Sequence, residues 1–179
     1  MGRYASYYAV QNDVIEQISK LTDEEVVDFL VEDFTSSDYV EIDKMWDGLH
    51  FLLANAHNLE GTEKKRSLLQ MFSSKKTKNN LVEPAIFGEK TIYPDPVVAI
   101  TDSELVSKIA ALFETIDING VLDGYDGKAF EEADIYPVVI WTREDANDIK
   151  QDLLEAFNTL KNFYVAASNR NDSVIVYLG

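Results

Sequence analysis

Short apolar runs alternate along this chain with longer stretches in which apolar residues recur every three to four positions. The short runs favour strands and the recurring spacing favours amphipathic helices, so the alternation predicts a sheet with helices packed against it. Residues 138–140 and 174–176 are apolar throughout, which is typical of strands covered on both faces. We therefore predict an α/β fold: a three-layer sandwich in which helices cover both faces of a mixed β-sheet.

The same patterns locate the individual elements. Strands are expected at residues 4–10, 85–87, 97–100, 135–141 and 173–178, and helices are expected to begin near residues 13, 22, 42, 101 and 142. Two of these helix starts have the spacing of a capping box, Thr22 with Glu25 and Thr101 with Glu104. Thr142 is expected to cap the last long helix.

The 179 residues fit one domain, because 46% of them are hydrophobic and no internal repeat divides them. We predict a single domain over residues 1–179. Between residues 57 and 80 the helical spacing gives way to Gly, Thr, Ser, Asn and Lys. This stretch is expected to be a mobile, Lys-rich surface excursion.

The composition limits the function. The chain has no cysteine, which excludes disulfides and thiolate chemistry, and its net charge is −16. Six of its basic residues lie within residues 62–80, so the remainder is still more acidic and repels phosphate backbones. No run approaches the roughly 18 to 20 apolar residues that span a bilayer. We expect a cytoplasmic protein that binds neither nucleic acid nor membrane, and whose partner, if it has one, is a basic protein.

Asp43, Asp47 and His50 are spaced to share one face of a helix over residues 42–56, with Trp46 beside them. Two carboxylates and an imidazole on one face can bind a divalent metal or act as a general acid and base. In the structural reading, Asp43 caps the helix and the other two groups form hydrogen bonds within the fold. Both readings stay open, and the structural one is preferred.

Three aromatic residues, Trp46, Tyr136 and Trp141, are candidates for lining a surface cleft, because Tyr and Trp offer both apolar area and a polar tip. Packing in the core is the alternative for each of them. Trp46 belongs to the apolar stripe of its helix, and Tyr136 precedes Pro137 at the start of the expected strand.

Recognisable cofactor and catalytic motifs are missing from the sequence. Residues 117–127 have the composition of a calcium loop, but an EF-hand requires an oxygen ligand at its fifth position and Glu at its twelfth, where this chain has Val121 and Lys128. Phosphate loops, dinucleotide fingerprints, nucleophile elbows and zinc-protease helices are likewise absent. We predict no cofactor and no metal site, and a turn-rich loop at residues 117–127.

The stretch IDKMWDGLHFLLAN, residues 42–55, resembles the central motif of the YfbM-like family of bacterial proteins. The aromatic first strand, AIFGEKTI, ADIYP before an apolar run, and the closing FYVAASNRNDSVIVYL are similar to that family as well. The Lys-rich residues 64–78 and the stretch 119–127 depart from its pattern. The resemblance implies an α/β fold, but the family supplies no established reaction, cofactor or catalytic residue.

Two classes of function follow from these observations. An acidic domain without a catalytic motif fits a non-enzymatic binding or protein-interaction role, as in small acidic proteins that neutralise basic toxins, and we favour this class. The alternative is a small-molecule or metal-binding enzyme that uses Asp43, Asp47 and His50. The accessibility of those three side chains distinguishes the two.

Overall fold

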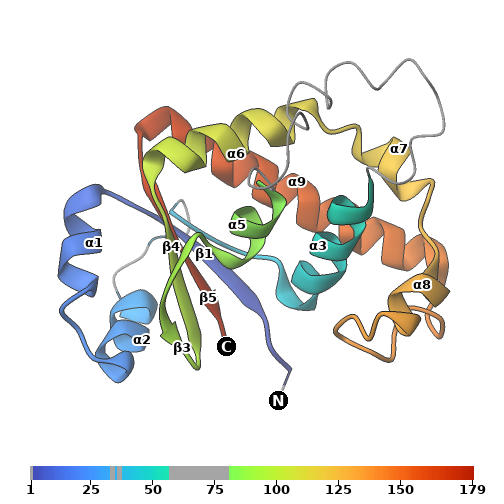
Figure 1. Ribbon diagram of the computed structural model, residues 1–179, viewed down its shortest axis with the longest axis horizontal. Helices are drawn as coiled ribbons and strands as arrows, with labels where there is room; N and C mark the ends of the chain where they lie inside the picture. Colours follow the sequence, from blue (N-terminus) through green and yellow to red (C-terminus); the bar gives the residue numbers. More distant parts are fainter. Residues whose placement is uncertain (1, 33–34, 36–37, 57–80) are drawn as a thin grey trace, which may run out of the picture.

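Five strands form one sheet in the order β2-β1-β5-β4-β3 (Figure 1). The computed structural model describes residues 2–32, 35, 38–56 and 81–179, so the excursion expected at residues 57–80 lies outside the described residues. The strands are β1 (Ala5–Val10), β2 (Tyr39–Glu41), β3 (Lys90–Pro94), β4 (Val97–Thr101) and β5 (Ser173–Leu178). The predicted α/β class is confirmed.

Every neighbouring pair of strands is antiparallel, so the prediction of a mixed sheet is wrong in that detail. The cause is the even number of long helices between β4 and β5. Helix α6 (Ser103–Thr115) leads away from the end of β4 and α9 (Ala146–Arg170) leads back beside it (Figure 1). Strand β5 therefore begins where β4 ends, and Val174 pairs with Thr101.

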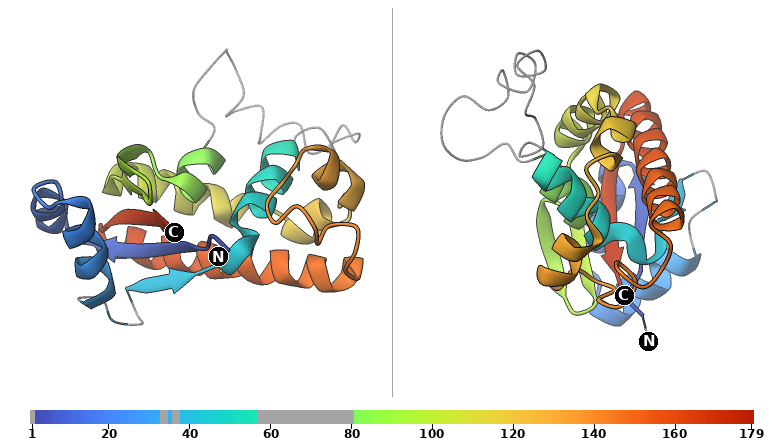
Figure 2. Two further views of the ribbon diagram at one scale, coloured as in Figure 1. Left: turned by 90° about the horizontal axis from the view of Figure 1, so that it is seen from below. Right: turned by 90° about the vertical axis from the view of Figure 1, so that its right-hand side faces the viewer.

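Helices cover both faces of the sheet. Ala5, Tyr7 and Ala9 of β1 point into a large core shared with α3 (Trp46–Asn55), α5 (Val82–Phe87), α6 and α9. Tyr8 and Val10 point the other way, into a smaller core with α1 (Asn12–Ile18) and α2 (Asp23–Glu32). Figure 2 shows this pair at one end of the molecule and α9 running along its length. The predicted three-layer sandwich is confirmed.

Residues 85–87 belong to helix α5, so the strand predicted there is wrong. Pro84 is tolerated in the first turn of a helix, and Gly88 ends the helix with φ at 78°. Two buried tyrosines hold its last turn, because the hydroxyl of Tyr7 donates to the carbonyl of Ile86 (3.1 Å) and that of Tyr164 donates to the carbonyl of Ala85 (2.9 Å).

Residues 135–141 form a series of turns, so the buried strand predicted there is also wrong. Pro137 has no N–H to donate to a neighbouring strand. Two other amides of the stretch find partners outside a sheet: Ile135 donates to the carbonyl of Phe130 and Ile140 donates to that of Pro137. The segment is a connection between α8 (Gly127–Glu132) and α9, and we call residues 133–145 the α8–α9 loop.

Of the three helix caps predicted at threonines, one is confirmed and two are displaced. Thr22 and Glu25 form the expected capping box at the start of α2. Helix α6 is capped by Asp102, whose Oδ1 accepts from the Leu105 amide at 2.8 Å, and α9 by Asp145, which accepts from the Asn147 amide at 2.8 Å. In each case an aspartate nearer the helix has replaced the predicted threonine.

Residues 117–127 contain a short helix, α7 (Ile118–Leu122), rather than only turns. Asp117 caps it by accepting from the Gly120 amide, and Asp126 caps α8 by accepting from the Lys128 amide. Two of the three carboxylates that gave this stretch its calcium-loop composition, Asp117 and Asp126, are thus helix caps. None of the helices in the described parts of the chain is both long and apolar enough to cross a bilayer.

Candidate functional site

The expected stripe of Asp43, Asp47 and His50 is divided between two elements. Asp43 opens a separate 3₁₀ turn, η1 (Asp43–Met45), with φ at 46°, and helix α3 begins only at Trp46. No side chain caps α3 at this end, so the cap that the structural reading assigns to Asp43 is wrong. Asp43 is exposed and lines a hollow beside α9. Asp47 and His50 are half-buried on α3 and interact with α5 and the α8–α9 loop. The three side chains do not converge on one space.

Asp47 joins α3 to the α8–α9 loop. Its Oδ2 accepts a hydrogen bond of 2.9 Å from the backbone amide of Tyr136. In a sheet, this amide would have donated to a carbonyl of a neighbouring strand. Here it donates to the Asp47 carboxylate instead. Asp47 thereby has the role expected in the structural reading of the stripe, that of a hydrogen-bonding group within the fold.

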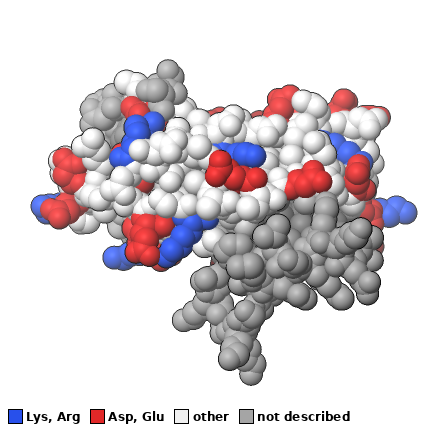
Figure 3. Space-filling view, turned by 90° about the horizontal axis from the view of Figure 1, so that it is seen from above, with Lys and Arg blue, Asp and Glu red and all other residues white. Residues whose placement is uncertain are grey.

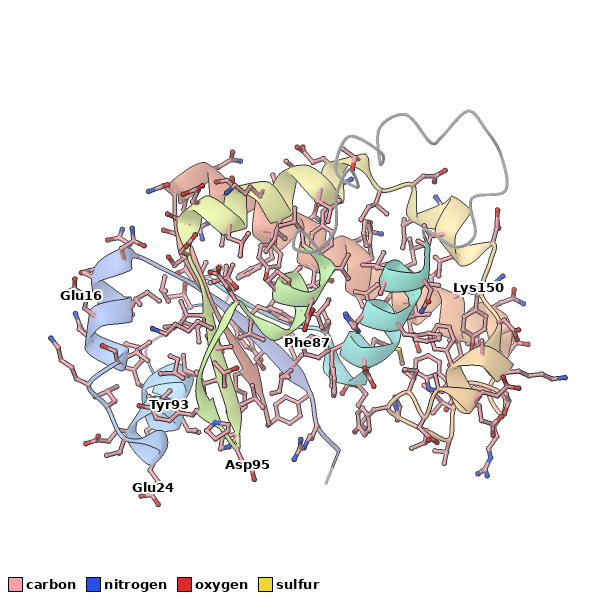
Figure 4. All side chains as sticks on the ribbon, in the orientation of Figure 1. Glu16, Glu24, Phe87, Tyr93, Asp95 and Lys150 are labelled. Carbon is pink, nitrogen blue, oxygen red and sulfur yellow. The ribbon has the colours of Figure 1, made fainter. Side chains whose placement is uncertain are left out.

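His50 packs its ring edge-on against Phe87, with the ring centres 4.8 Å apart. Phe87 is the last residue of α5 and lies beside α3 (Figure 4). Burial lowers the pKa of His50, and it outweighs the opposing effects of the carboxylates of Asp47 and Glu83. The imidazole is therefore neutral near pH 7.

Trp46 and Tyr136 hold the residues that precede β1. Their rings stack with centres 5.6 Å apart, and Phe87 packs edge-on against Trp46 at 5.8 Å. The backbone amide of Arg3 donates to the Tyr136 hydroxyl (2.9 Å), and the indole N–H of Trp46 donates to the Arg3 carbonyl (3.3 Å). These two half-buried aromatic residues contact one another and the chain rather than an open cleft.

Trp141 lies in the core, with 2% of its surface exposed, and does not line a cleft. Its indole N–H donates to the carbonyl of Ile135 at 2.8 Å, and its ring packs against Phe130. The same ring lies over Gly48 of α3, where an added Cβ would come within 2.2 Å of it. Trp141 is the residue that fixes the α8–α9 loop to the body of the protein.

A groove lined by carboxylates is the functional candidate that the sequence analysis missed. It has a volume of about 300 Å³ and lies between α9 and the segment formed by β2 and η1. Its acidic residues are Glu41, Asp43, Asp152 and Glu155, and its floor includes Ile42, Met45 and Ala156. We call it the acidic groove. The sequence contained one signal for it: Asp148, Asp152 and Glu155 have the spacing of a single helix face.

Neighbouring carboxylates act on Asp152 in the groove. The pKa of Asp152 is raised, first by its partial burial and then by the negative charges of its neighbours, Glu155, Asp148 and Asp43. Two groove oxygens have partners of their own, since Glu41 accepts from the hydroxyl of Tyr39 at 2.7 Å and Glu155 accepts from the amide of Gln151 at 2.8 Å. Such an arrangement favours an approaching cation.

A second hollow of about 200 Å³ lies between α7 and α9. It is lined by polar side chains from both helices and by two apolar residues, Leu122 and Leu154. It contains Lys150 as well as Asp123, so its charge is mixed. In the parts of the chain that the structure describes, no group of three or more His, Cys, Asp or Glu side chains is placed to hold a metal ion.

Comparisons with known proteins identify the family. Residues 1–177 match the model of the domain of unknown function DUF1877. The chain is 26% identical to Protein YfbM of Escherichia coli (strain K12) over 147 residues, which cover 80% of this chain and 78% of that one. The crystal structure of YfbM from Escherichia coli, a protein of unknown function, has the same fold, with a TM-score of 0.70, 18% identity, and coverage of 98% of this chain and 99% of that one. The expected resemblance to YfbM is confirmed, and the chain belongs to the DUF1877 family.

Proposed function

We propose that this protein is a non-enzymatic protein-interaction domain and that its acidic groove binds a basic partner. The observation that carries the proposal is the groove itself, in which four carboxylates line a hollow of about 300 Å³. Burial and the negative charges of its neighbours disfavour the charged form of Asp152, so positive charge brought into the groove is favourable there. Lys and Arg side chains of a partner supply that charge.

The position of the carboxylates suits a protein partner. Asp152 and Glu155 lie on α9, and Glu41 and Asp43 lie on β2 and η1, so the negative charges are spread along both sides of the groove. A partner with several separated Lys or Arg side chains can contact carboxylates on both sides. On the face seen in Figure 3, by contrast, acidic and basic side chains are interspersed.

The net charge of −16 supports the same partner. Long-range attraction by an acidic protein raises the rate at which a basic protein reaches it, and it disfavours nucleic acids and anionic lipid surfaces. The proposal includes the cytoplasmic location expected from the sequence. The alternative, an enzyme that uses Asp43, Asp47 and His50, has less support because these side chains belong to different surroundings.

Affinity capture with matched variants tests this function. The groove variant combines Asp152→Asn with Glu155→Gln, and the control combines Glu24→Gln with Asp28→Asn, two exposed carboxylates of α2. Both variants lose the same charge, but Glu24 lies at the opposite end of the molecule from Lys150 of α9 (Figure 4). Proteins captured from the native cytoplasm are identified by mass spectrometry.

We expect the parent and the control to capture the same basic protein, and the groove variant to lose it by roughly tenfold, since two charged contacts are removed. Equal capture by all three proteins would show that the groove is not the binding site. Capture of neutral or acidic proteins alone would contradict the proposed partner.

A further inference from the structure

Two valines of the α8–α9 loop are exposed. They belong to the stretch IYPVVI, residues 135–140, whose other members are half-buried, and Ile135 and Ile140 pack against the large core. Val138 is 46% exposed and Val139 is 56% exposed, and together with Tyr4 they are the exposed large hydrophobic residues of the described chain. A run of this composition is typical of a buried strand, so its exposure needs a reason.

The loop is held in a fixed conformation. Asp47 accepts from the Tyr136 amide, and the Trp141 indole donates to the Ile135 carbonyl. On its other side, the hydroxyl of Tyr125 donates to the carbonyl of Trp141 at 2.9 Å. Val138 and Val139 are therefore presented to solvent by a framework that is already ordered, which lowers the entropy lost when a partner binds.

Carboxylates flank the exposed run on both sides. Glu131, Glu132 and Asp134 precede it, Glu144 and Asp145 follow it, and all five are exposed. The loop then leads directly into α9, whose first turns carry Asp148 and, further along, the groove residues Asp152 and Glu155. At 1.5 Å per residue, Asp148 and Glu155 are separated by about 10 Å along the helix. The apolar run and the acidic groove are thus joined by one helix.

We infer that Val138 and Val139 anchor the basic partner, and that the partner segment carries apolar side chains flanked by Lys and Arg. The inference rests on the proposed function and specifies the chemistry of the partner. Apolar contact with the two valines supplies affinity that does not depend on charge, and the surrounding carboxylates select segments with positive charge beside the apolar side chains.

Charge decides between this occupant and two others. A second copy of the chain would bring a net charge of −16 to a rim that is already negative. A bilayer with anionic head groups would meet the same repulsion. A basic segment meets attraction at every carboxylate around the run.

Three labelled synthetic peptides of equal length test the inference by fluorescence anisotropy. The first has Leu at helical spacing and Lys elsewhere, the second replaces Leu with Ser, and the third replaces Lys with Glu. The proteins are the parent, the loop variant Val138→Ser with Val139→Ser, the groove variant Asp152→Asn with Glu155→Gln, and the control Tyr4→Ser. Tyr4 is 41% exposed and lies outside the loop, so the control removes comparable apolar surface elsewhere.

We expect the parent to bind the Leu-Lys peptide more tightly than the Ser-Lys peptide. The loop variant should bind the Leu-Lys peptide about tenfold more weakly, because about half of each valine is available for burial. It should bind the Ser-Lys peptide as the parent does. The Tyr4 control should match the parent, and the groove variant should bind both cationic peptides more weakly. A cooperative thermal transition with a midpoint no lower than that of the parent by more than a few degrees establishes that each variant is folded.

Four binding results would contradict the inference, and they distinguish the role of the two valines from that of the groove. Equal binding of the Leu-Lys peptide by the parent and the loop variant overturns the anchor and leaves the groove in place. Equal binding of both cationic peptides by the parent and the groove variant overturns the proposed function. Binding of the Leu-Glu peptide as tight as that of the Leu-Lys peptide overturns the basic character of the partner, and failure of the parent to bind the Leu-Lys peptide overturns both.

Discussion

Gly48 is the residue at which α3 and the α8–α9 loop come closest. A Cβ at this position would lie 2.2 Å from the ring of Trp141, which is itself buried. We predict that Gly48→Ala destabilises the fold by about 1–3 kcal/mol, the range for overpacking a filled core. Denaturant titration measures the loss. Gly120→Ala, at an exposed position of helix α7, is the matched control and should cost less than about 0.5 kcal/mol. Equal effects of the two substitutions would mean that the Trp141 ring shifts to make room for the added methyl group.

The carboxylate of Asp152 in the acidic groove affects the stability of the fold. Its pKa is raised in the folded chain, so its charged form is less favourable there than in the unfolded chain. The cost is present when the pH is above the folded pKa and disappears as the pH falls below the unfolded pKa, where both states are protonated. Asp152→Asn should therefore raise the thermal midpoint near neutral pH, by about 1–2 °C after solvent screening, and leave it unchanged in strong acid.

Asp28→Asn is the control for this measurement, because Asp28 is exposed in the middle of another helix. It should move the midpoint less than Asp152→Asn does. A lower midpoint for Asp152→Asn at neutral pH would show that this carboxylate stabilises the fold, and the argument from repulsion within the groove would fail.

At the scale of one element, the structure and the sequence prediction differ in the residue that caps α9. Asp145 accepts from the Asn147 amide, whereas the hydroxyl of Thr142 donates to the side chain of Glu131. We predict that Asp145→Ala lowers the free energy of unfolding by about 1 kcal/mol, the usual cost of losing a cap. Thr142→Ala, which removes an exposed hydrogen bond, should cost less than about half of that. The reverse order would place the cap at Thr142.

The elements that were predicted correctly are those whose patterns are local. Strands β1 and β5 and helix α2, with its capping box, follow from residue spacing and from one pair of polar side chains. Helix α5 was missed because the three apolar residues 85–87 can form either a strand or a helical turn. Pro84, Gly88 and the distant hydroxyls of Tyr7 and Tyr164 decide for the helix.

The site was predictable only in part, because it depends on contacts across the fold. The aromatic residues Trp46 and Tyr136 are neighbours in space but lie far apart in the sequence, and their stacking has no local signature. The acidic groove likewise needs β2 and η1 to lie beside α9. The exposed apolar run was recognised as apolar, but its hydrophobicity indicated burial. The backbone amide of Tyr136 donates a hydrogen bond to Asp47 of α3, and no sequence pattern predicts this contact.

At the scale of the whole molecule, the net charge of −16 is the dominant property. Self-repulsion of this size destabilises a compact chain, and the ion pairs of the described residues are largely exposed and contribute little against it. We predict that raising sodium chloride from low concentration to roughly 0.5 M increases the thermal midpoint near neutral pH by about 2–5 °C, because the salt screens the repulsion.

The same salt series near pH 4.4, the isoelectric point calculated from the sequence, is the control, since the net charge there is close to zero. The increase should largely disappear. A midpoint that falls with salt near neutral pH would show that attraction between opposite charges outweighs the self-repulsion.

Strand β5 is the middle strand of the sheet and also the last of its five strands in sequence order. Until it is in place, β1 with β2 and β4 with β3 are separate two-stranded pieces, and such pairs are marginally stable alone. During synthesis on the ribosome the sheet therefore cannot close before residue 178 has emerged. Nearly the whole chain, including its apolar segments, must wait unfolded or partly folded, which is the interval in which a nascent chain most needs protection from aggregation.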